Sequence, residues 1–280
     1  METILLTSTH LHPKRAAGEQ FTRPRPDGLR LIERGWAVLP ENWVAEKSVS
    51  VLPRPIKVWT IPRPKGKRHD KCTTAYIATF AGRQKALAEC IESLKDQVDR
   101  IVIWDNSTKV DDLGDIGKFA YSHIWEGYVF TCDDKLIYPP DYVETMIQKI
   151  EHYNRNAVVS VHGRNIPKDC KSYYRGCPEM FNYTETVKED VRVDEIGTGV
   201  MAFHWSLCKD LPMEVFEHTN MTDIYFSKWL NERGTPRIVV AHEMGWIQVS
   251  KMLKPPQISA VHRQDDALHT RIVNEITWKR

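Results

Sequence analysis

From residue 73 onward, short runs of β-branched and aromatic residues alternate with stretches in which apolar residues recur at helical spacing. The first such pair is TTAYIATF followed by AGRQKALAECIESLKDQ. Short apolar runs of this kind indicate buried strands, and strands that alternate with helices are typical of a parallel sheet covered by helices. The sequence therefore predicts an α/β fold with a mostly parallel, Rossmann-like sheet.

The same alternation continues to about residue 241. Further strands are predicted in RIVIWD, GYVFT, AVVSV, GVMAF and RIVVA, and further helices over about 141–153 and in TDIYFSKWLNERG. Residues 163–195 interrupt the pattern, because they are polar and carry several aromatic residues. We expect them to form a long surface loop over a site.

Residues 1–72 differ from the rest of the chain in composition. They hold 14 Lys and Arg against 7 Asp and Glu, whereas residues 73–280 hold 25 against 30, and eight of the 16 prolines precede residue 72. Proline disfavours helix interiors and central strands, so we predict that this basic segment forms an extended arm or an irregular cap. Its Trp36, Trp43 and Trp59 indicate that the arm packs on the body. The predicted organisation is an arm over 1–72, an α/β domain over 73–250 and a C-terminal extension over 251–280.

Several classes of protein are disfavoured by the sequence. No stretch of about 18 residues is free of charged side chains, and the N-terminus has no basic region followed by a long apolar run. We therefore expect no transmembrane segment and a cytoplasmic location. The six cysteines form no CxxC pair, which argues against a zinc knuckle or a disulfide framework and favours buried thiols.

Polar residues follow two of the predicted strands, where ligands of open parallel sheets bind. Thr79 and Arg83 stand at the end of the first strand and the start of a helix, and could contact a nucleotide or simply begin the helix. Asp105 and Asn106 follow the second strand and could bind a base or ribose, although this pattern is also common in turns.

Two adjacent carboxylates, Asp133 and Asp134, end the third strand. Like charges side by side favour a bound cation, and a divalent ion with phosphate oxygens would satisfy them. A solvated acidic turn is the alternative.

With these residues in view, the chain from about Thr74 to Trp246 resembles the nucleotide-sugar-dependent glycosyltransferases of the GT-A fold, in particular family-2-like enzymes. The resemblance rests on AYIATFAGRQKALAECIESLKDQVDRIVIWDNS, GYVFTCDDKLIYPPDYV, GTGVMAFH and TDIYFSKWLNERG, and covers roughly 60% of the chain. It implies transfer of a sugar from a nucleoside-diphosphate sugar, with a UDP-sugar expected, to an acceptor hydroxyl.

The resemblance also implies roles for single residues. Thr79, Arg83, Asp105 and Asn106 would line the nucleotide pocket, while Asp133 and Asp134 would hold the ribose and the diphosphate. Asp223, at the predicted start of the last long helix, would be the general base of an inverting transfer, although Asp223 or Thr222 could instead serve only as the N-cap.

One position departs from the family pattern, because Lys135 stands where a third, metal-binding carboxylate is expected. Two interpretations follow. Asp134 or Asp133, together with His242, still binds Mn or Mg, or the Lys135 ammonium itself stabilises the leaving diphosphate. The first is the prediction, with Asp134 and His242 as the ligands.

The acceptor is left open by the sequence. The basic arm suits a polyanion, so a hydroxymethylated DNA base and a glycan are both expected acceptors. A catalytically inactive nucleotide-sugar or nucleic-acid binding module is the alternative function. A nucleotidyltransferase is less favoured, because AGRQK carries a single glycine where a phosphate loop would be glycine-rich.

Overall fold

The computed structural model describes residues 69–107, 112–252 and 266–279, together with the strands at 3–8, 20–24, 37–38 and 57–60. The chain divides into two units, Met1–Pro55 and Ile56–Arg280.

The first unit contains a three-stranded antiparallel sheet in the order β2-β1-β3. Its strands are β1 (Thr3–Ser8), β2 (Gln20–Pro24) and β3 (Ala37–Val38). The sequence predicted an extended arm or an irregular cap here. The described part of this segment forms strands, and Pro24 lies on an edge strand, where the missing N–H is tolerated.

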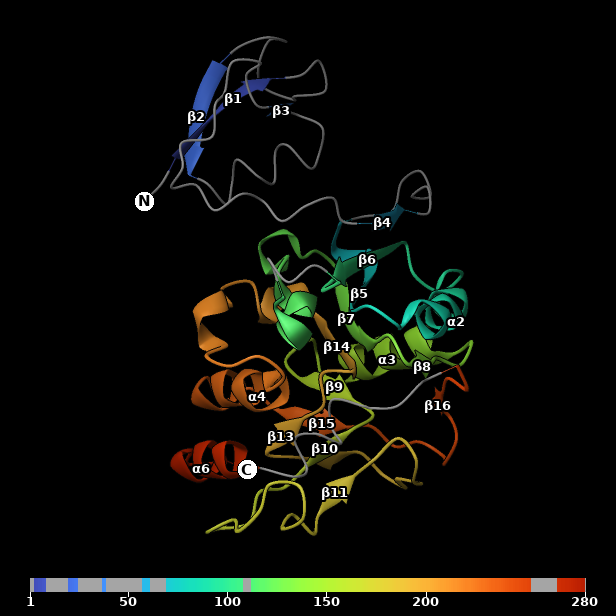
Figure 1. The fold of residues 1–280 in the computed structure, drawn as a ribbon, viewed down its shortest axis with the longest axis vertical. Helices are drawn as coiled ribbons and strands as arrows, with labels where there is room; N and C mark the ends of the chain where they lie inside the picture. Colours follow the sequence, from blue (N-terminus) through green and yellow to red (C-terminus); the bar gives the residue numbers. More distant parts are fainter. Residues whose placement is uncertain are drawn as a thin grey trace. The chain divides into compact units, whose positions relative to one another are not determined.

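The second unit is built on an eight-stranded sheet in the order β12-β15-β9-β14-β7-β5-β6-β4 (Figure 1). These strands are β4 (Lys57–Thr60), β5 (Thr73–Thr79), β6 (Arg100–Asp105), β7 (Tyr128–Asp133), β9 (Val158–Ser160), β12 (Val191–Arg192), β14 (Val200–His204) and β15 (Arg237–Val239). Because β4 pairs with β6, the boundary between the units lies at residue 55, and the end of the predicted arm is part of this sheet.

Five of the eight strands run in one direction. Parallel pairing joins β5 to β6 and β7, and β9 to β15, while β14 runs antiparallel to both β7 and β9. The edge strands β4 and β12 also run opposite to their neighbours. The predicted α/β class with a mostly parallel sheet is therefore confirmed, and the arrangement is consistent with a Rossmann-like GT-A fold.

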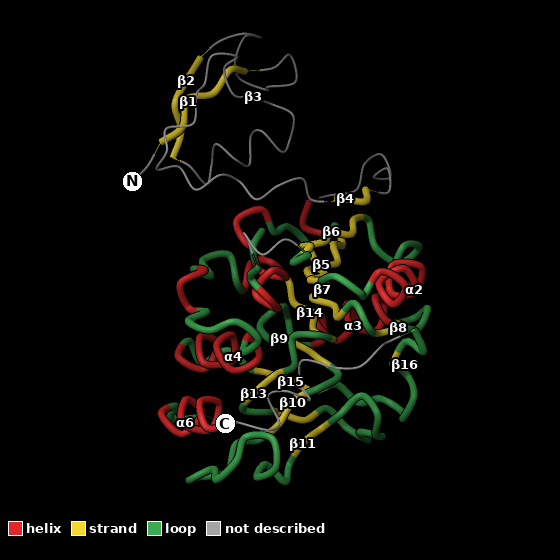
Figure 2. Tube along the Cα trace, viewed as in Figure 1, coloured by secondary structure: helices red, strands yellow, loops and turns green. Residues whose placement is uncertain are grey.

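Helices cover both faces of the sheet (Figures 1 and 2). Ala75 and Ile77 of β5 face the helices α2 (Gln84–Leu94) and α3 (Tyr142–His152), whereas Tyr76 faces the layer of α4 (Thr222–Glu232) and α6 (Ala267–Glu275). This alternation follows from the pleat of a strand, in which successive side chains point to opposite faces. The predicted helices and strands of this unit are present, with ends shifted by one to a few residues.

The segment 163–196 differs from the surface loop predicted for it. It contains the short strands β10 (Gly163–Arg164), β11 (Met180–Phe181) and β13 (Glu195–Ile196). Arg164 lies directly opposite Glu195, and their side chains form an ion pair of 3.2 Å that is almost fully buried. The Tyr173 hydroxyl donates to Glu195 at 2.7 Å, and its ring lies under the Arg164 guanidinium. We call Arg164, Tyr173 and Glu195 the Glu195 cluster.

The C-terminal extension is anchored to the second unit by α6. Ile272 and Val273 are buried in the same hydrophobic layer as α4, and Tyr173 N donates to Thr270 Oγ1 at 2.9 Å. Short elements complete the described chain: β8 (Leu136–Ile137), β16 (Gln248–Val249), and the 3-10 turns η1 (His69–Lys71), η3 (Gly114–Phe119), η4 (Ser122–Ile124), η5 (Trp205–Leu207) and η6 (Met213–Val215).

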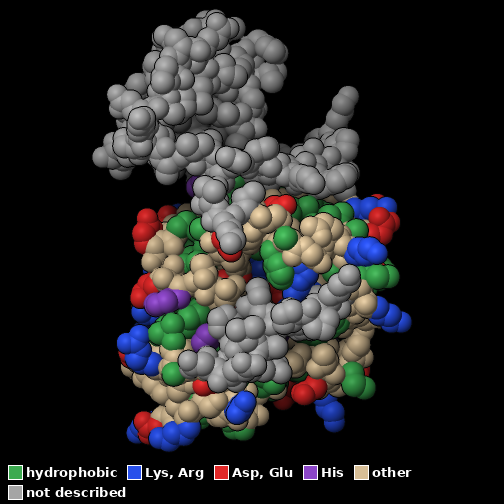
Figure 3. Space-filling model, in the orientation of Figure 1, with side chains coloured by type: hydrophobic (Ala, Val, Ile, Leu, Met, Phe, Trp, Pro, Cys, Tyr) green, Lys and Arg blue, Asp and Glu red, His purple; other side chains and the backbone are tan. Residues whose placement is uncertain are grey.

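Two expectations about the whole chain can be compared with these elements. Five of the six cysteines are buried, Cys177 is half-buried, and all six are free thiols, as predicted. Among the described residues, no helix has the length and apolar character needed to cross a membrane. The expected packing of the arm on the body concerns side chains outside the described residues. On the face shown in Figure 3, Lys, Arg, Asp and Glu side chains lie around the outline of the second unit.

Candidate functional site

The carboxyl ends of three neighbouring parallel strands meet at one edge of the central sheet. The register places Thr79 of β5 opposite Asp105 of β6, and Ala78 of β5 opposite Asp133 of β7. The polar residues that follow these strands therefore lie side by side, as their place in the sequence led us to expect. Ligands of open α/β sheets bind at this edge.

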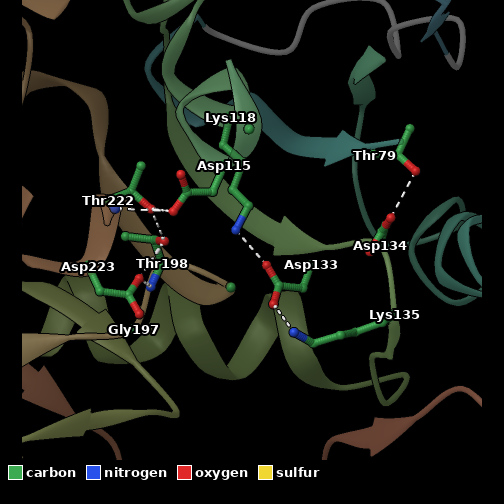
Figure 4. A network of polar contacts seen from close by, with 12 residues as sticks. Thr79, Asp115, Lys118, Asp133, Asp134, Lys135, Gly197, Thr198, Thr222 and Asp223 are labelled. Atoms are coloured by element: carbon green, nitrogen blue, oxygen red, sulfur yellow. Dashed lines mark hydrogen bonds and ion pairs between the residues drawn. The ribbon is translucent and has the colours of Figure 1, made fainter. Parts of the chain in front are cut away.

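Asp133, the last residue of β7, is paired with two lysines (Figure 4). Lys118 Nζ donates a hydrogen bond of 2.5 Å to Asp133 Oδ1, and Lys135 Nζ lies 3.0 Å from Oδ2. We call these three residues the Asp133 cluster. Burial favours the neutral acid, but the two ammonium groups outweigh it and hold the pKa of Asp133 well below its usual value. Asp133 is therefore ionised at neutral pH.

Lys118 comes from η3 and is the most enclosed charge of the cluster, with 5% of its side chain exposed against 26% for Lys135. Burial disfavours its charged form, yet Asp133 and Asp115 raise the pKa of Lys118 above its ordinary value. Lys118 is thus a buried ammonium ion. Sequence analysis missed it, because η3 is a 3-10 turn without the apolar periodicity by which we identified the strands and long helices.

The backbone of Asp133 is tied to residue 199 at the start of β14. Asp133 N donates to Gly199 O at 2.9 Å and to Tyr138 Oη at 2.8 Å, and the Tyr138 hydroxyl donates in turn to Gly199 O. A Cβ atom at position 199 would lie 2.5 Å from Asp133 Cγ. Glycine at this position therefore lets the carboxylate pack directly on the backbone of β14.

Asp134 points away from the lysines and toward the end of β5. Its Oδ2 accepts a hydrogen bond of 2.8 Å from Thr79 Oγ1, and its Oδ1 lies 3.5 Å from Arg83 Nη1. Burial raises the pKa of Asp134 above its ordinary value, although the Thr79 hydrogen bond opposes this. Arg83 is buried, lies over the Phe80 ring, and its Nη1 atom makes no hydrogen bond within the described part of the chain.

The two predicted residues after β6 have different surroundings. Asp105 is exposed and accepts hydrogen bonds from Ser107 N, at 2.9 Å, and from the Ser107 hydroxyl. The Asn106 Oδ1 atom accepts hydrogen bonds from Trp104 Nε1 and Leu113 N, and its Nδ2 atom donates to Gly114 O at the start of η3. Asn106 thereby holds the chain that leads into η3, a role that the sequence did not indicate.

Asp223 lies in the first turn of α4 and is oriented by Thr198. Its Oδ1 accepts hydrogen bonds from Thr198 N at 2.8 Å and from Thr198 Oγ1 at 2.6 Å (Figure 4). No described residue donates to Asp223 Oδ2. One carboxylate oxygen therefore fixes the side chain while the other is left available to a ligand.

Neither Asp223 nor Thr222 caps α4, so the alternative prediction for these residues is wrong. The cap residue is Met221, which has no capping side chain. Asp115 of η3 supplies the acceptor instead, because its carboxylate bonds Asn220 N at 2.6 Å and both Thr222 N and Thr222 Oγ1. Burial raises the pKa of Asp115. The same 3-10 turn thus carries the lysine on Asp133 and the carboxylate that caps the helix of Asp223.

His162 was also missed by the sequence analysis. A Cβ atom at Gly197 would overlap its ring, so the ring packs on the segment that leads to Thr198. Its Nδ1 atom lies 2.9 Å from Phe181 O. Burial lowers the pKa of His162 to about 4, with the Arg164 charge acting in the same direction. His162 is therefore neutral at physiological pH.

The residues predicted to bind a metal do not provide a matching set of ligands. Both oxygens of Asp134 face Thr79 and Arg83, and both oxygens of Asp133 face lysines. The His242 Nδ1 and Nε2 atoms lie 2.7 Å from Val240 O and 3.2 Å from Asn182 O. In the described ranges, no three His, Cys, Asp or Glu side chains group as metal ligands would. A divalent ion does not fit these residues, because ammonium and guanidinium groups occupy the positions beside the carboxylates.

The fold and this edge of the sheet define an α/β protein with a charged site at the ends of its parallel strands. No protein-family model matches the chain, and no curated protein matches it. Among solved structures, it is similar to the crystal structure of S. aureus TarS 1–349, with a TM-score of 0.40 and 11% sequence identity. The match covers 64% of this chain and 60% of the TarS chain, so it spans less than two thirds of that structure.

Proposed function

We propose that this protein is a glycosyltransferase that moves a sugar from a nucleoside-diphosphate sugar, such as a UDP-sugar, to an acceptor hydroxyl with inversion. One observation carries the proposal: two carboxylates contact two consecutive residues, Thr198 and Gly199. Asp133 packs on Gly199, and Asp223 bonds to Thr198. An ionic site and an available base thus lie on either side of one peptide unit.

Asp223 is the proposed general base. A nucleoside diphosphate is already a good leaving group, so the protein has to orient the acceptor hydroxyl, remove its proton and stabilise the departing charge. Asp223 Oδ1 is fixed by Thr198, while Oδ2 has no donor among the described residues. A carboxylate held in this way accepts a proton at Oδ2, in a fixed orientation, which suits a base acting on an oriented hydroxyl.

The proposed nucleotide pocket lies beside the Asp133 cluster. Thr79 and Arg83 meet at Asp134, and the Arg83 Nη1 atom is buried without a hydrogen bond. A buried donor of this kind is satisfied when a ligand oxygen binds it. We assign Thr79, Arg83 and Asp134 to the nucleotide and retain Asp105 and Asn106 as the neighbouring wall.

The acceptor stays a prediction from composition. A hydroxymethylated DNA base and a glycan both fit a basic segment over 1–72, whose Lys and Arg side chains, apart from that of Lys71, lie outside the described residues. Salt-sensitive binding to DNA would distinguish the two, because phosphate contacts weaken steeply with ionic strength.

The test is the Asp223→Asn variant, assayed for release of the nucleoside diphosphate from a panel of UDP-, GDP-, ADP- and dTDP-sugars. Loss of a general base is expected to slow release by about 10² to 10⁴-fold. The matching nucleoside diphosphate should still raise the melting temperature of the variant as it does for the wild type. Asp210→Asn, a change at an exposed carboxylate, serves as the control and should retain full activity.

Two results would count against the proposal. If Asp223→Asn loses nucleotide binding and release together, Asp223 is a binding residue and not the base. If the wild-type protein binds a nucleoside diphosphate but releases none from any donor, the chain is an inactive binding module.

A further inference from the structure

We infer that Lys118 and Lys135 together bind the diphosphate of the donor, in the place where a divalent metal was expected. The inference rests on the proposed function and adds to it the means by which the leaving group is held. It begins from an imbalance inside the Asp133 cluster, where two ammonium groups share one carboxylate.

Lys118 has hydrogen-bonding capacity that the described protein does not use. An ammonium group carries three N–H donors. Asp133 Oδ1 is the one acceptor that the described residues offer to Lys118 Nζ, although the side chain is only 5% exposed. A buried charged group with unused donors is costly unless something else accepts from it. Oxygen atoms of a phosphate supply such acceptors.

Lys135 gives the same site a contact with solvent. Its side chain is 26% exposed, and its ammonium reaches the second oxygen of Asp133 at 3.0 Å. Asp133 therefore holds two cations, one at each of its oxygens: Lys118 is buried, and Lys135 is accessible to an entering ligand. Lysine binds phosphate as a point charge and does not require the paired geometry of arginine, so both ammonium groups can turn from the carboxylate toward a diphosphate.

The position of the cluster fits the leaving group of the proposed reaction. Asp133 packs on Gly199, and the preceding residue, Thr198, holds Asp223. Consecutive Cα atoms are about 3.8 Å apart, so the cations and the base stand close to one reacting centre. Fixed positive charge at the place where negative charge develops lowers the barrier to transfer. Lys118 and Lys135 thus perform the electrostatic work for which the sequence suggested Mn or Mg.

The probe is inorganic pyrophosphate, because it tests the diphosphate site without assuming the base or the sugar. Binding is measured by isothermal titration calorimetry on the full chain in EDTA, and again with Mg²⁺ in excess. We expect binding in EDTA, weakened at least about tenfold by Lys118→Met and by Lys135→Met.

Lys149→Met is the matched control. Lys149 Nζ bonds both oxygens of Asp190 at 2.7 and 2.9 Å, and its side chain is 30% exposed, so it forms a lysine–carboxylate pair of similar exposure to Lys135 that lies outside the Asp133 cluster. Pyrophosphate binding should be unchanged in this variant. If Lys118→Met does not fold because Asp133 loses its buried partner, the result for Lys135→Met decides alone, because Asp133 still pairs with Lys118 in that variant.

Three results would overturn the inference. These are pyrophosphate binding that appears only with Mg²⁺, binding that is as strong in both cluster variants as in the wild type, and no binding under either condition. Failure here is distinguishable from failure of the proposed function. Donor cleavage that requires Mg²⁺ and depends on Asp223 would leave the transferase intact and remove the lysine site, whereas lysine-dependent pyrophosphate binding without donor cleavage would do the reverse.

Discussion

The Asp133 cluster and the Glu195 cluster both place a carboxylate beside cations inside the second unit, yet their charges are held differently. Asp133 has two ammonium partners, and its pKa lies well below its usual value. Glu195 is 1% exposed, and burial raises its pKa to about 7 even though Arg164 lies beside it and opposes the shift. The nearby Asp223 charge adds to the increase.

This difference shows that an ion pair alone does not decide whether a carboxyl group is ionised. The number of cations around the carboxylate and its access to water decide its protonation state. Asp133 is a permanent negative charge that arranges two cations at the sheet edge. Glu195 is enclosed by the Tyr173 hydroxyl and the cross-strand Arg164, so it serves the packing of the segment 163–196. The following three predictions test that contrast through the free energy of unfolding.

The largest effect is expected from Arg164→Met. At pH 8, above the pKa of Glu195, both partners are charged, and removing one partner of a buried ion pair leaves the other charge uncompensated, which costs about 3 to 5 kcal/mol. Urea unfolding followed by circular dichroism measures the loss. Arg233→Met is the control, because Arg233 lies over the Trp229 ring at the same 4.3 Å as Arg164 over Tyr173 but is exposed, and it should cost less than about 1 kcal/mol. Equal losses in the two variants would show that the Glu195 cluster is not a buried ionic unit.

The second effect is a pH dependence that belongs to Glu195. Its folded-state pKa of about 7 lies above the ordinary value of 4.5, so the folded protein binds the extra proton between these values. Stability from this group is complete below pH 4.5 and is lost as the pH rises through 7. Between pH 5 and 7.5, the wild type should lose about 2 to 3 kcal/mol relative to Glu195→Gln.

Asp133 does not contribute to this loss of stability between pH 5 and 7.5. Its folded-state pKa is lowered, so the stability it provides is present above its ordinary pKa and is lost only in strong acid.

Urea unfolding of the wild type and of Glu195→Gln between pH 5 and 7.5 measures the contribution of Glu195. Parallel pH profiles for the wild type and Glu195→Gln would mean that Glu195 is ionised throughout.

The smallest effect is expected from Lys135→Met. The Lys135 side chain is 26% exposed and Asp133 keeps its buried partner Lys118, so the loss of stability should stay below about 1 kcal/mol. Thermal unfolding measures it, with Lys149→Met as the comparison. A loss above about 2 kcal/mol would make Lys135 a structural residue like Arg164.

The sequence predicted the sheet edge well, because the strand ends follow from local pattern. Asp133 and Asp134 terminate a buried run, and Thr79 and Asp105 terminate its neighbours, so their proximity follows from parallel pairing alone. The start of α4 near Asp223 was predicted on the same basis.

The sequence could not supply the partners of these residues, since contacts between distant segments leave no local signal. Lys118 and Asp115 lie in a 3-10 turn without periodicity, 15 and 107 residues from the groups they bond. The sequence predicted Asn106 as a turn residue or a nucleotide ligand, whereas its side-chain amide bonds the backbone at the start of η3. Tyr173 was expected at the surface because its neighbours are polar, and burial against Arg164 and α6 could not be foreseen from composition.

The reversed direction of β14 has one more consequence. Because it runs against β7 and β9, its first residues enter the sheet at the edge where those strands leave it. Thr198, which holds Asp223 by hydrogen bonds, and Gly199, on which Asp133 packs, are therefore neighbours across one rigid peptide. The spacing between the two carboxylates is set by that peptide together with the hydrogen bonds on one side and the packing contact on the other, so a larger substrate cannot widen it without breaking one of these contacts. Any variation in what such a site accepts has to come from the loops around it.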